Sequence, residues 1–147
     1  MIGRLLAGRY RIERMLGEGG VGRVYRASHE NLERPVAVKM LLAEHADNEH
    51  ARARFLREAK TLAALHHPHI VTVVDFGIDE TPFLVLELVQ GEELENWVQR
   101  GALDPKLALQ VLEQILSAVV CAHAGGVIHR DLKPSNIFVR ELHTSVH

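Results

Sequence analysis

Residues 129–136 read His-Arg-Asp-Leu-Lys-Pro-Ser-Asn, and this stretch decides how the rest of the chain is interpreted. It places a carboxylate, an ammonium group and a carboxamide close together, at Asp131, Lys133 and Asn136. The residues at 127–128 and 137–139 are rich in Val, Ile and Phe, so we expect a polar loop between two short strands. Such a dense run of constrained polar positions is improbable by chance and indicates a loop that performs chemistry.

Composition bounds the classes of protein that fit. The chain has 147 residues, of which 47% are apolar and 24% charged, as in one globular domain. A net charge of −2 gives no reason to expect nucleic acid. We expect no membrane span, because no apolar run approaches the roughly 20 residues that a bilayer requires. The single cysteine, Cys121, predicts a reduced, buried thiol in a cytoplasmic chain.

The hydrophobic pattern predicts an α+β organisation without internal repeats or linkers. Short β-rich runs separated by Gly and Asn give five strands, at 10–16, 24–27, 36–41, 70–76 and 83–89. Apolar residues at helical spacing predict an inserted helix over 48–65. Beyond residue 89 we expect a short helix over 92–99 and a long one that Asp104 caps, Pro105 begins and Gly125 ends.

A glycine cluster lies between the first two strands, as Gly17-Glu18-Gly19-Gly20-Val21-Gly22-Arg23-Val24. Glycine lets a backbone approach phosphate oxygens closely. Alone, Gly-x-Gly-x-x-Gly also fits a dinucleotide-binding turn, but that reading requires a helix to follow at once. A returning strand follows here, which favours a phosphate-covering hairpin. A glycine-rich hairpin without a ligand is the remaining alternative.

Lys39 ends the apolar strand motif Val36-Ala37-Val38-Lys39. A charge on such a strand is costly unless it has a partner. Phosphate oxygens and the carboxylate of Glu58, in the middle of the predicted helix, are the expected partners. The alternative is that Glu58 is solvated and pairs with surface arginines.

With these three motifs in this order, the chain resembles bacterial serine/threonine protein kinases of the eukaryotic type. Gly8-Arg9-Tyr10-Arg11-Ile12 and Leu16-Gly17-Glu18-Gly19-Gly20 are similar to that group in particular. The resemblance runs from about Gly8 to Val139. It implies a protein-kinase-like fold, with the small lobe and the approach to the hinge over about 8–89 and the start of the large lobe over 90–147.

The resemblance also implies roles for individual residues, with ATP and Mg²⁺ as cofactors and a protein Ser/Thr hydroxyl as acceptor. Asp131 is the expected catalytic base, Lys133 neutralises the moving phosphoryl group, and Asn136 binds magnesium. Lys39 holds the phosphates and pairs with Glu58. The implied nucleotide-binding residues are Leu16, Gly17, Gly19, Gly22, Val24, Ala37, Lys39, Glu87, Val89, Glu93 and Phe138.

One family feature is missing after the catalytic loop. Residues 137–147 contain neither Asp nor Gly, so the Asp-Phe-Gly that binds the second metal does not follow Asn136. Asp75-Phe76-Gly77 precedes the loop, and we expect it to be a strand end leading into a turn. The chain is therefore expected to be a truncated kinase domain with impaired or no activity. The alternatives are a non-catalytic nucleotide-binding module and a regulatory fragment that associates with another kinase chain.

A histidine cluster offers a separate candidate. His66, His67 and His69 suggest a metal site, but no Cys or carboxylate accompanies them at ligand spacing. A structural role after the helix is the preferred interpretation.

Overall fold

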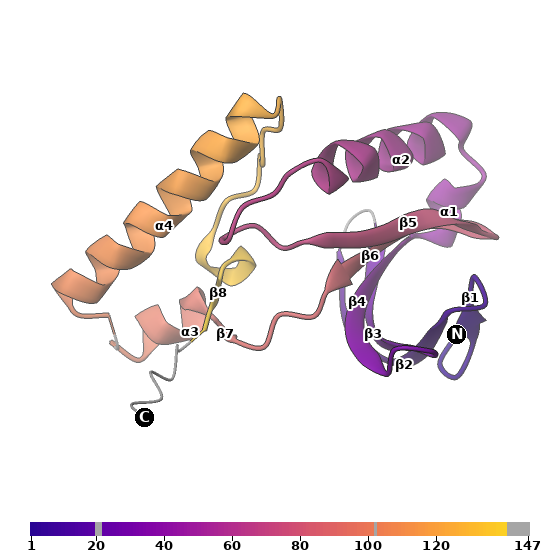
Figure 1. Cartoon of the computed structure of the whole chain (residues 1–147), viewed down its shortest axis with the longest axis horizontal. Helices are drawn as coiled ribbons and strands as arrows, with labels where there is room; N and C mark the ends of the chain where they lie inside the picture. The colour runs from indigo at the N-terminus through magenta and orange to yellow at the C-terminus, as the bar shows by residue number, and fades with distance from the viewer. Residues whose placement is uncertain (20–21, 102, 141–147) are drawn as a thin grey trace. The chain divides into compact units, whose positions relative to one another are not determined.

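The computed structural model describes residues 1–19, 22–101 and 103–140, which form two compact units. The first unit contains residues 1–66 and 70–88, and the second contains residues 67–69 and those from 89 onward. Figure 1 shows the helices and strands of both units.

A six-stranded antiparallel sheet forms the body of the first unit, in the order β1-β2-β3-β4-β6-β5. The five expected strands are present, and a two-residue strand that the sequence did not predict is added at the edge. The strands are β1 (Leu5–Leu6), β2 (Tyr10–Gly19), β3 (Gly22–His29), β4 (Arg34–Leu41), β5 (Val73–Asp79) and β6 (Thr81–Glu87).

Alternation along β4 explains which face of the sheet is the core. Val36, Val38 and Met40 are buried, whereas Ala37 and Lys39 between them are half-buried. Because successive side chains of a strand point to opposite faces, the first set joins one apolar cluster. That cluster contains Leu6, Tyr10, Ile12, Tyr25, Ala27, Val36, Val38, Met40, Phe83 and Val85. Lys39 therefore lies on the other face of the sheet.

Two helices complete the first unit. The expected helix is α2 (Glu49–Ala63), which lies beside β5 (Figure 1) and begins at Asn48, whose side chain accepts a hydrogen bond from the amide of Ala51. A one-turn helix that the sequence did not predict, α1 (Ala43–Ala46), precedes it. The N-cap hydrogen bond fixes the start of α2, the helix that carries Glu58.

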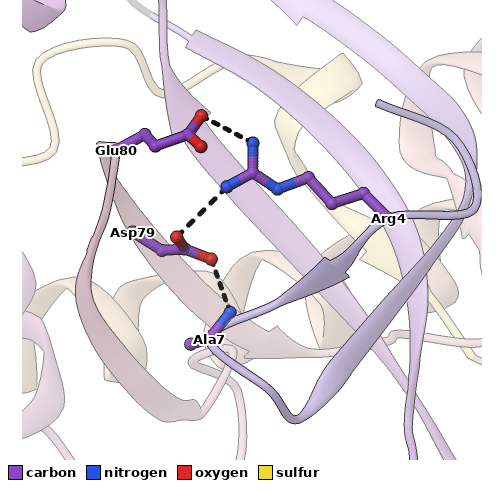
Figure 2. A network of polar contacts seen from close by, with 4 residues as sticks. All are labelled: Arg4, Ala7, Asp79 and Glu80. Carbon is purple, nitrogen blue, oxygen red and sulfur yellow. Dashed lines mark hydrogen bonds and ion pairs between the residues drawn. The ribbon is translucent and has the colours of Figure 1, made fainter.

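Polar side chains join the two edges of the sheet. Arg4, next to β1, contacts Asp79 at 3.1 Å and Glu80 at 2.7 Å, and the amide of Ala7 donates to Asp79 at 2.6 Å. Figure 2 shows this network at the tip of the β5–β6 hairpin. Since β1 and β5 lie at opposite ends of the strand order, the network links edges that backbone pairing leaves apart.

Asp75-Phe76-Gly77 lies within β5, not at its end. Phe76 pairs with Leu84 and Gly77 with Phe83, and β5 continues to Asp79. The expectation of a strand end followed by a turn at this point is therefore wrong. The carboxylate of Asp75 accepts a hydrogen bond from the hydroxyl of Tyr10 at 2.8 Å and pairs with Arg9 at 2.9 Å. Its role is to tie β2 to β5.

The second unit is mainly helical. It contains β7 (Glu92–Glu93), α3 (Leu94–Gln99), α4 (Pro105–Ala124), a 3₁₀ turn η1 (Pro134–Asn136) and β8 (Phe138–Val139). As predicted, Asp104 caps α4 by accepting from the amide of Leu107, and Gly125 ends the helix. The strand expected at 127–128 is absent, and the amide of Val127 instead donates to the carbonyl of Ala122 and caps the end of the helix. β8 pairs with β7 instead.

Helix α4 exposes a long apolar surface within the described residues. None of its residues is fully buried, and four large apolar side chains are exposed: Leu109, Leu112, Leu116 and Val120. By length and composition α4 is the one described helix that could cross a membrane, which is weak evidence because core helices of soluble proteins meet the same criterion. The sequence was expected to contain no apolar run of membrane length. Helix α4, with 20 residues, meets the criterion of length and composition.

Candidate active site

One face of the sheet in the first unit presents several of the predicted site residues. Val24 lies opposite Lys39 between β3 and β4, and Lys39 lies opposite Leu84 between β4 and β6. Ala37 is two residues from Lys39 and so shares its face. The register therefore places Val24, Ala37 and Lys39 on one surface, away from the buried cluster.

Lys39 and Glu58 line the same pocket. Its walls come from β4, α1, α2 and β6, and the lining residues are Lys39, Leu41, His45, Ala51, Arg54, Phe55, Glu58, Ala59, Leu62 and Leu84. The lining combines cationic and anionic groups with apolar side chains. No ion pair joins Lys39 to Glu58 among the described side chains, although both residues line this pocket.

The glycine hairpin joins β2 to β3. Gly17 lies opposite Val24, and Gly19 lies opposite Gly22. A Cβ atom on Gly17 or Gly19 would meet no atom within 4 Å, whereas one on Gly22 would lie 2.7 Å from the carbonyl oxygen of Met40. Gly22 is thus required by packing, and the two others border open space. Gly20 and Val21 of the predicted motif lie outside the described residues.

The end of β6 is fixed by Glu87. Its amide donates to the carbonyl of Thr72 at 3.0 Å, and its carboxylate accepts from the amide of Thr72 at 3.0 Å. The amide of Glu87 is therefore already used within the first unit. Leu16 is exposed on β2, and Val89, the other residue implied here, is half-buried at the start of the second unit.

The second unit brings Glu93 and Phe138 together. They lie directly opposite each other in the β7–β8 pair, and the amide of Leu94 donates to the carbonyl of Ile137 at 2.8 Å. Phe138 is 47% exposed, so its ring is open to contact with a ligand. Two residues that were predicted separately to contact nucleotide thus share one small sheet.

The polar loop at 129–136 folds around Asp131. The carboxamide nitrogen of Asn136 donates to the carbonyl oxygen of Asp131 at 2.8 Å and to its carboxylate Oδ2 at 3.0 Å. The ammonium of Lys133 lies 3.1 Å from the same Oδ2. The hydrogen bond from Lys133, and then that from Asn136, lowers the pKa of Asp131 below its usual range. The three predicted polar groups therefore form one connected cluster.

The backbone of this loop is held in an unusual conformation. Arg130 has φ of 62°, in the left-handed region that non-glycine residues rarely adopt. The amide of Asp131 donates to Nδ1 of His129 at 3.3 Å, and η1 follows with Asn136 as its last residue. Strain of this kind persists where the surroundings fix the loop, often at functional sites.

The cluster has the right chemistry for magnesium. Among the described residues, both hydrogen bonds of the Asn136 side chain use the amide nitrogen, which leaves the amide oxygen to serve as a cation ligand. Magnesium prefers oxygen ligands and takes only one or two from the protein when a nucleotide supplies phosphates.

In the described part of the chain no group of three or more His, Cys, Asp or Glu could hold a metal. His67 contacts the hydroxyl of Ser117 at 3.0 Å.

Gly91 is a close-contact position that the sequence analysis missed. A Cβ atom there would lie 2.7 Å from the carbonyl oxygen of Val139. The glycine therefore allows the segment before β7 to approach β8, which carries Phe138. Its position in Gln90-Gly91-Glu92, just before a predicted helix, was the available signal.

Comparison with known proteins identifies a family. The sequence model of the protein kinase domain matches residues 10–146. The chain is 44% identical over 142 residues to the serine/threonine-protein kinase PrkC of Bacillus subtilis, covering 95% of this chain and 22% of that protein. It is 43% identical over 145 residues to the serine/threonine-protein kinase PknA of Mycobacterium tuberculosis, covering 94% and 34%.

Solved structures agree on the fold. The crystal structure of the PknI kinase domain of Mycobacterium tuberculosis matches with a TM-score of 0.76 at 31% identity, covering 95% of this chain and 58% of that one. A doubly substituted form of that domain matches with a TM-score of 0.79 at 30% identity, covering 97% and 58%. The chain thus spans between a fifth and three fifths of the length of the relatives it matches.

Proposed function

This chain belongs to the protein kinase domain family, and on that premise we propose that it binds ATP with magnesium and supports phosphoryl transfer to a serine or threonine hydroxyl. The observation that supports this most is the cluster of Asp131, Lys133 and Asn136. It combines a base, a cation and a metal ligand within hydrogen-bonding distance. Phosphoryl transfer requires little else from a protein than positioning and charge stabilisation.

The two oxygens of Asp131 have different surroundings. Both Lys133 and Asn136 contact Oδ2, and these contacts leave Oδ1 to accept a hydrogen bond from a substrate hydroxyl. The carboxylate of Asp131 is ionised at neutral pH, as its lowered pKa requires, and can accept a hydrogen bond from the hydroxyl that transfers its proton. Magnesium, when bound at Asn136 and the nucleotide, would neutralise phosphate charge.

The first unit supplies the other proposed contacts. Lys39, on the open face of β4, is the proposed partner of the phosphates, and Glu58 in the same pocket is the proposed partner of Lys39. Val24 and Ala37 on the same face provide apolar contacts for a purine. The relatives are named as serine/threonine kinases, which supports Ser/Thr as the acceptor, as does a lysine two residues after Asp131.

The cellular setting is part of the same proposal. We place this domain in the cytoplasm, where ATP is available and a lone thiol such as Cys121 stays reduced. A protein substrate with a Ser/Thr hydroxyl, and association with a second kinase chain, are proposed as partners of the protein that contains this domain.

Isothermal titration calorimetry with ATP and MgCl₂ tests the proposal on the 147-residue chain. Lys39→Ala is expected to weaken ATP binding at least tenfold, because it removes a charge-assisted contact to phosphate. Arg34→Ala is the matched control, since it removes a cation from the exposed start of the same strand. Circular dichroism melts establish that both variants are folded. Equal ATP affinity in the unsubstituted chain and Lys39→Ala would remove Lys39 from the site.

A further inference from the structure

An ion pair spans the glycine hairpin at a point that the proposed function does not use. Nε of Arg23 lies 2.9 Å from Oε2 of Glu18, and a second guanidinium nitrogen lies 3.3 Å from Oε1. Both side chains are about half exposed. The contact is bidentate, the geometry in which a guanidinium and a carboxylate fit each other best.

The strand register shows that this pair lies directly across the hairpin. Glu18 pairs with Arg23, and the next pair toward the tip is Gly19 with Gly22. Glycines have no side chains with which to hold a cross-strand register. Glu18 and Arg23 are thus the side chains nearest the tip, among those described, that can fix it.

The pair lies on the face of the hairpin opposite the proposed phosphate contacts. Arg23 pairs with Met40, which belongs to the buried cluster, whereas Val24 pairs with Lys39. Adjacent residues of a strand point to opposite faces, so Arg23 points away from the face that carries Lys39. Direct contact between this guanidinium and a nucleotide beside Lys39 is therefore excluded by the register.

Gly22 connects the pair to Lys39. It is adjacent to Arg23, it is buried, and its Cα is so close to β4 that a Cβ would lie 2.7 Å from the carbonyl of Met40 and 3.4 Å from the side chain of Lys39. A shift of the first residues of β3 would therefore be transmitted to the lysine. Preserving the Glu18–Arg23 register preserves this contact.

We propose that Glu18 and Arg23 are positioning residues that brace the glycine hairpin from its rear face and so raise affinity for ATP. The inference rests on the proposed function, since it concerns the same nucleotide site. The pair acts through Gly22 and Lys39 and does not touch the ligand. Exposed pairs of this kind change an equilibrium constant by about two- to fivefold, and salt screens them.

The test is ATP–Mg²⁺ affinity by calorimetry for four forms of the 147-residue chain: unsubstituted, Glu18→Gln, Arg23→Gln and the exchange Glu18→Arg with Arg23→Glu. Each single substitution is expected to weaken binding about two- to fivefold at 50 mM NaCl. The exchanged pair is expected to restore most of that loss, and the differences should shrink at 500 mM NaCl. Arg14→Gln, which removes an exposed cation from the same hairpin, is expected to have no such effect.

Two other results would overturn the inference. If Arg23→Gln weakens binding while Glu18→Gln strengthens it, the residues act through their charges on the phosphates and not as a brace. If neither changes affinity in a chain that does bind ATP, the hairpin needs no brace. Failure of the unsubstituted chain to bind ATP would overturn the proposed function as well, so the two failures are distinguishable. Hydrogen exchange of the Val24 amide, faster in both single variants and restored in the exchange, is the expected signature in the free chain.

Discussion

At the scale of single residues, Asp75 and Asp131 show how partners decide what an aspartate does. Asp75 is the first residue of an Asp-Phe-Gly sequence, which is also the sequence of a metal-binding motif. In the structure it contacts Tyr10 and Arg9. Asp131 is exposed and contacts Lys133 and Asn136, which leave one oxygen open. The first residue is a structural tie between strands, and the second is available for chemistry.

Tyr10 makes the tie to Asp75 sensitive to alkaline pH. Burial, and after it the hydrogen bond to Asp75, raises the pKa of Tyr10 to about 12. A phenol whose pKa is raised on folding stabilises the folded state fully below about pH 10, and loses that effect as pH rises toward 12. We therefore expect the Tm of the chain to fall more steeply than that of Tyr10→Phe between pH 9.5 and 11.5.

At neutral pH the unsubstituted chain is expected to be more stable than Tyr10→Phe. Tyr10→Phe removes one hydrogen bond and is expected to lower the free energy of unfolding by about 0.5–1.5 kcal/mol. Differential scanning fluorimetry across the pH range measures both effects, and other titrating groups cancel in the comparison. Parallel pH profiles for the two chains would show that Tyr10 ionises equally easily in the folded and unfolded states.

At the scale of elements, the glycine hairpin contains glycines of two kinds. Gly17 faces open space, so its freedom serves the approach of a ligand, whereas Gly22 is pressed against β4. Both glycines belong to the same Gly-x-Gly-x-x-Gly motif. Only the position of β4, which comes from the sheet register, separates their roles.

This difference gives a paired prediction. Gly22→Ala is expected to lower the free energy of unfolding by about 1–3 kcal/mol, because its Cβ would overlap the carbonyl of Met40 and force β3 to shift. Gly17→Ala is expected to leave the stability nearly unchanged. Urea denaturation followed by circular dichroism compares the two. A similar small effect for both would mean that the start of β3 moves away from β4 at little cost.

Helix α4 shows a contrast between ends and surface. The two ends of the helix are set by nearby residues in the sequence. These residues are Asp104, Pro105 and Gly125, as the sequence predicts. Its surface depends on the packing of other segments: Val111, Ile115 and Val119 are half-buried. Leu109, Leu116 and Val120 are exposed. A surface of that kind is an association or aggregation liability for the isolated chain.

At the scale of the whole molecule, the proposed site residues belong to two units. Lys39 and Glu58 belong to the first, and Asp131, Lys133 and Asn136 to the second. Catalysis in this family requires both groups together with two metal-binding positions. Within the 147 residues, Asn136 is the proposed metal-binding position, and no Asp-Phe-Gly follows it.

We therefore expect the isolated 147-residue polypeptide to bind ATP but to transfer phosphate negligibly. The measurement is transfer of radiolabelled γ-phosphate to the chain itself and to a generic basic protein. Asp131→Asn is the control, because a catalytic base contributes about 10²- to 10⁴-fold to the rate. Robust transfer that Asp131→Asn abolishes would contradict the expectation and would point to a metal ligand supplied by a partner chain.

The family, the five main strands, the helices α2, α3 and α4, and the residues of the polar loop could be predicted from the sequence. These features are encoded locally: alternation in β4, the caps of α4, and the close spacing of Asp131, Lys133 and Asn136. Side chains so near in sequence meet through a few backbone torsions, so a motif is enough to predict the cluster.

Contacts between residues that are distant in sequence became visible only in the folded structure. It added β1, tied Arg4 to Glu80 across 76 positions, placed Asp75 within a strand, and set Glu93 opposite Phe138. It also showed that Gly22 is fixed by Met40 and that Glu18 faces Arg23. The physical reason is that these contacts depend on sheet register and on the packing of separate segments, which no local pattern of residues specifies.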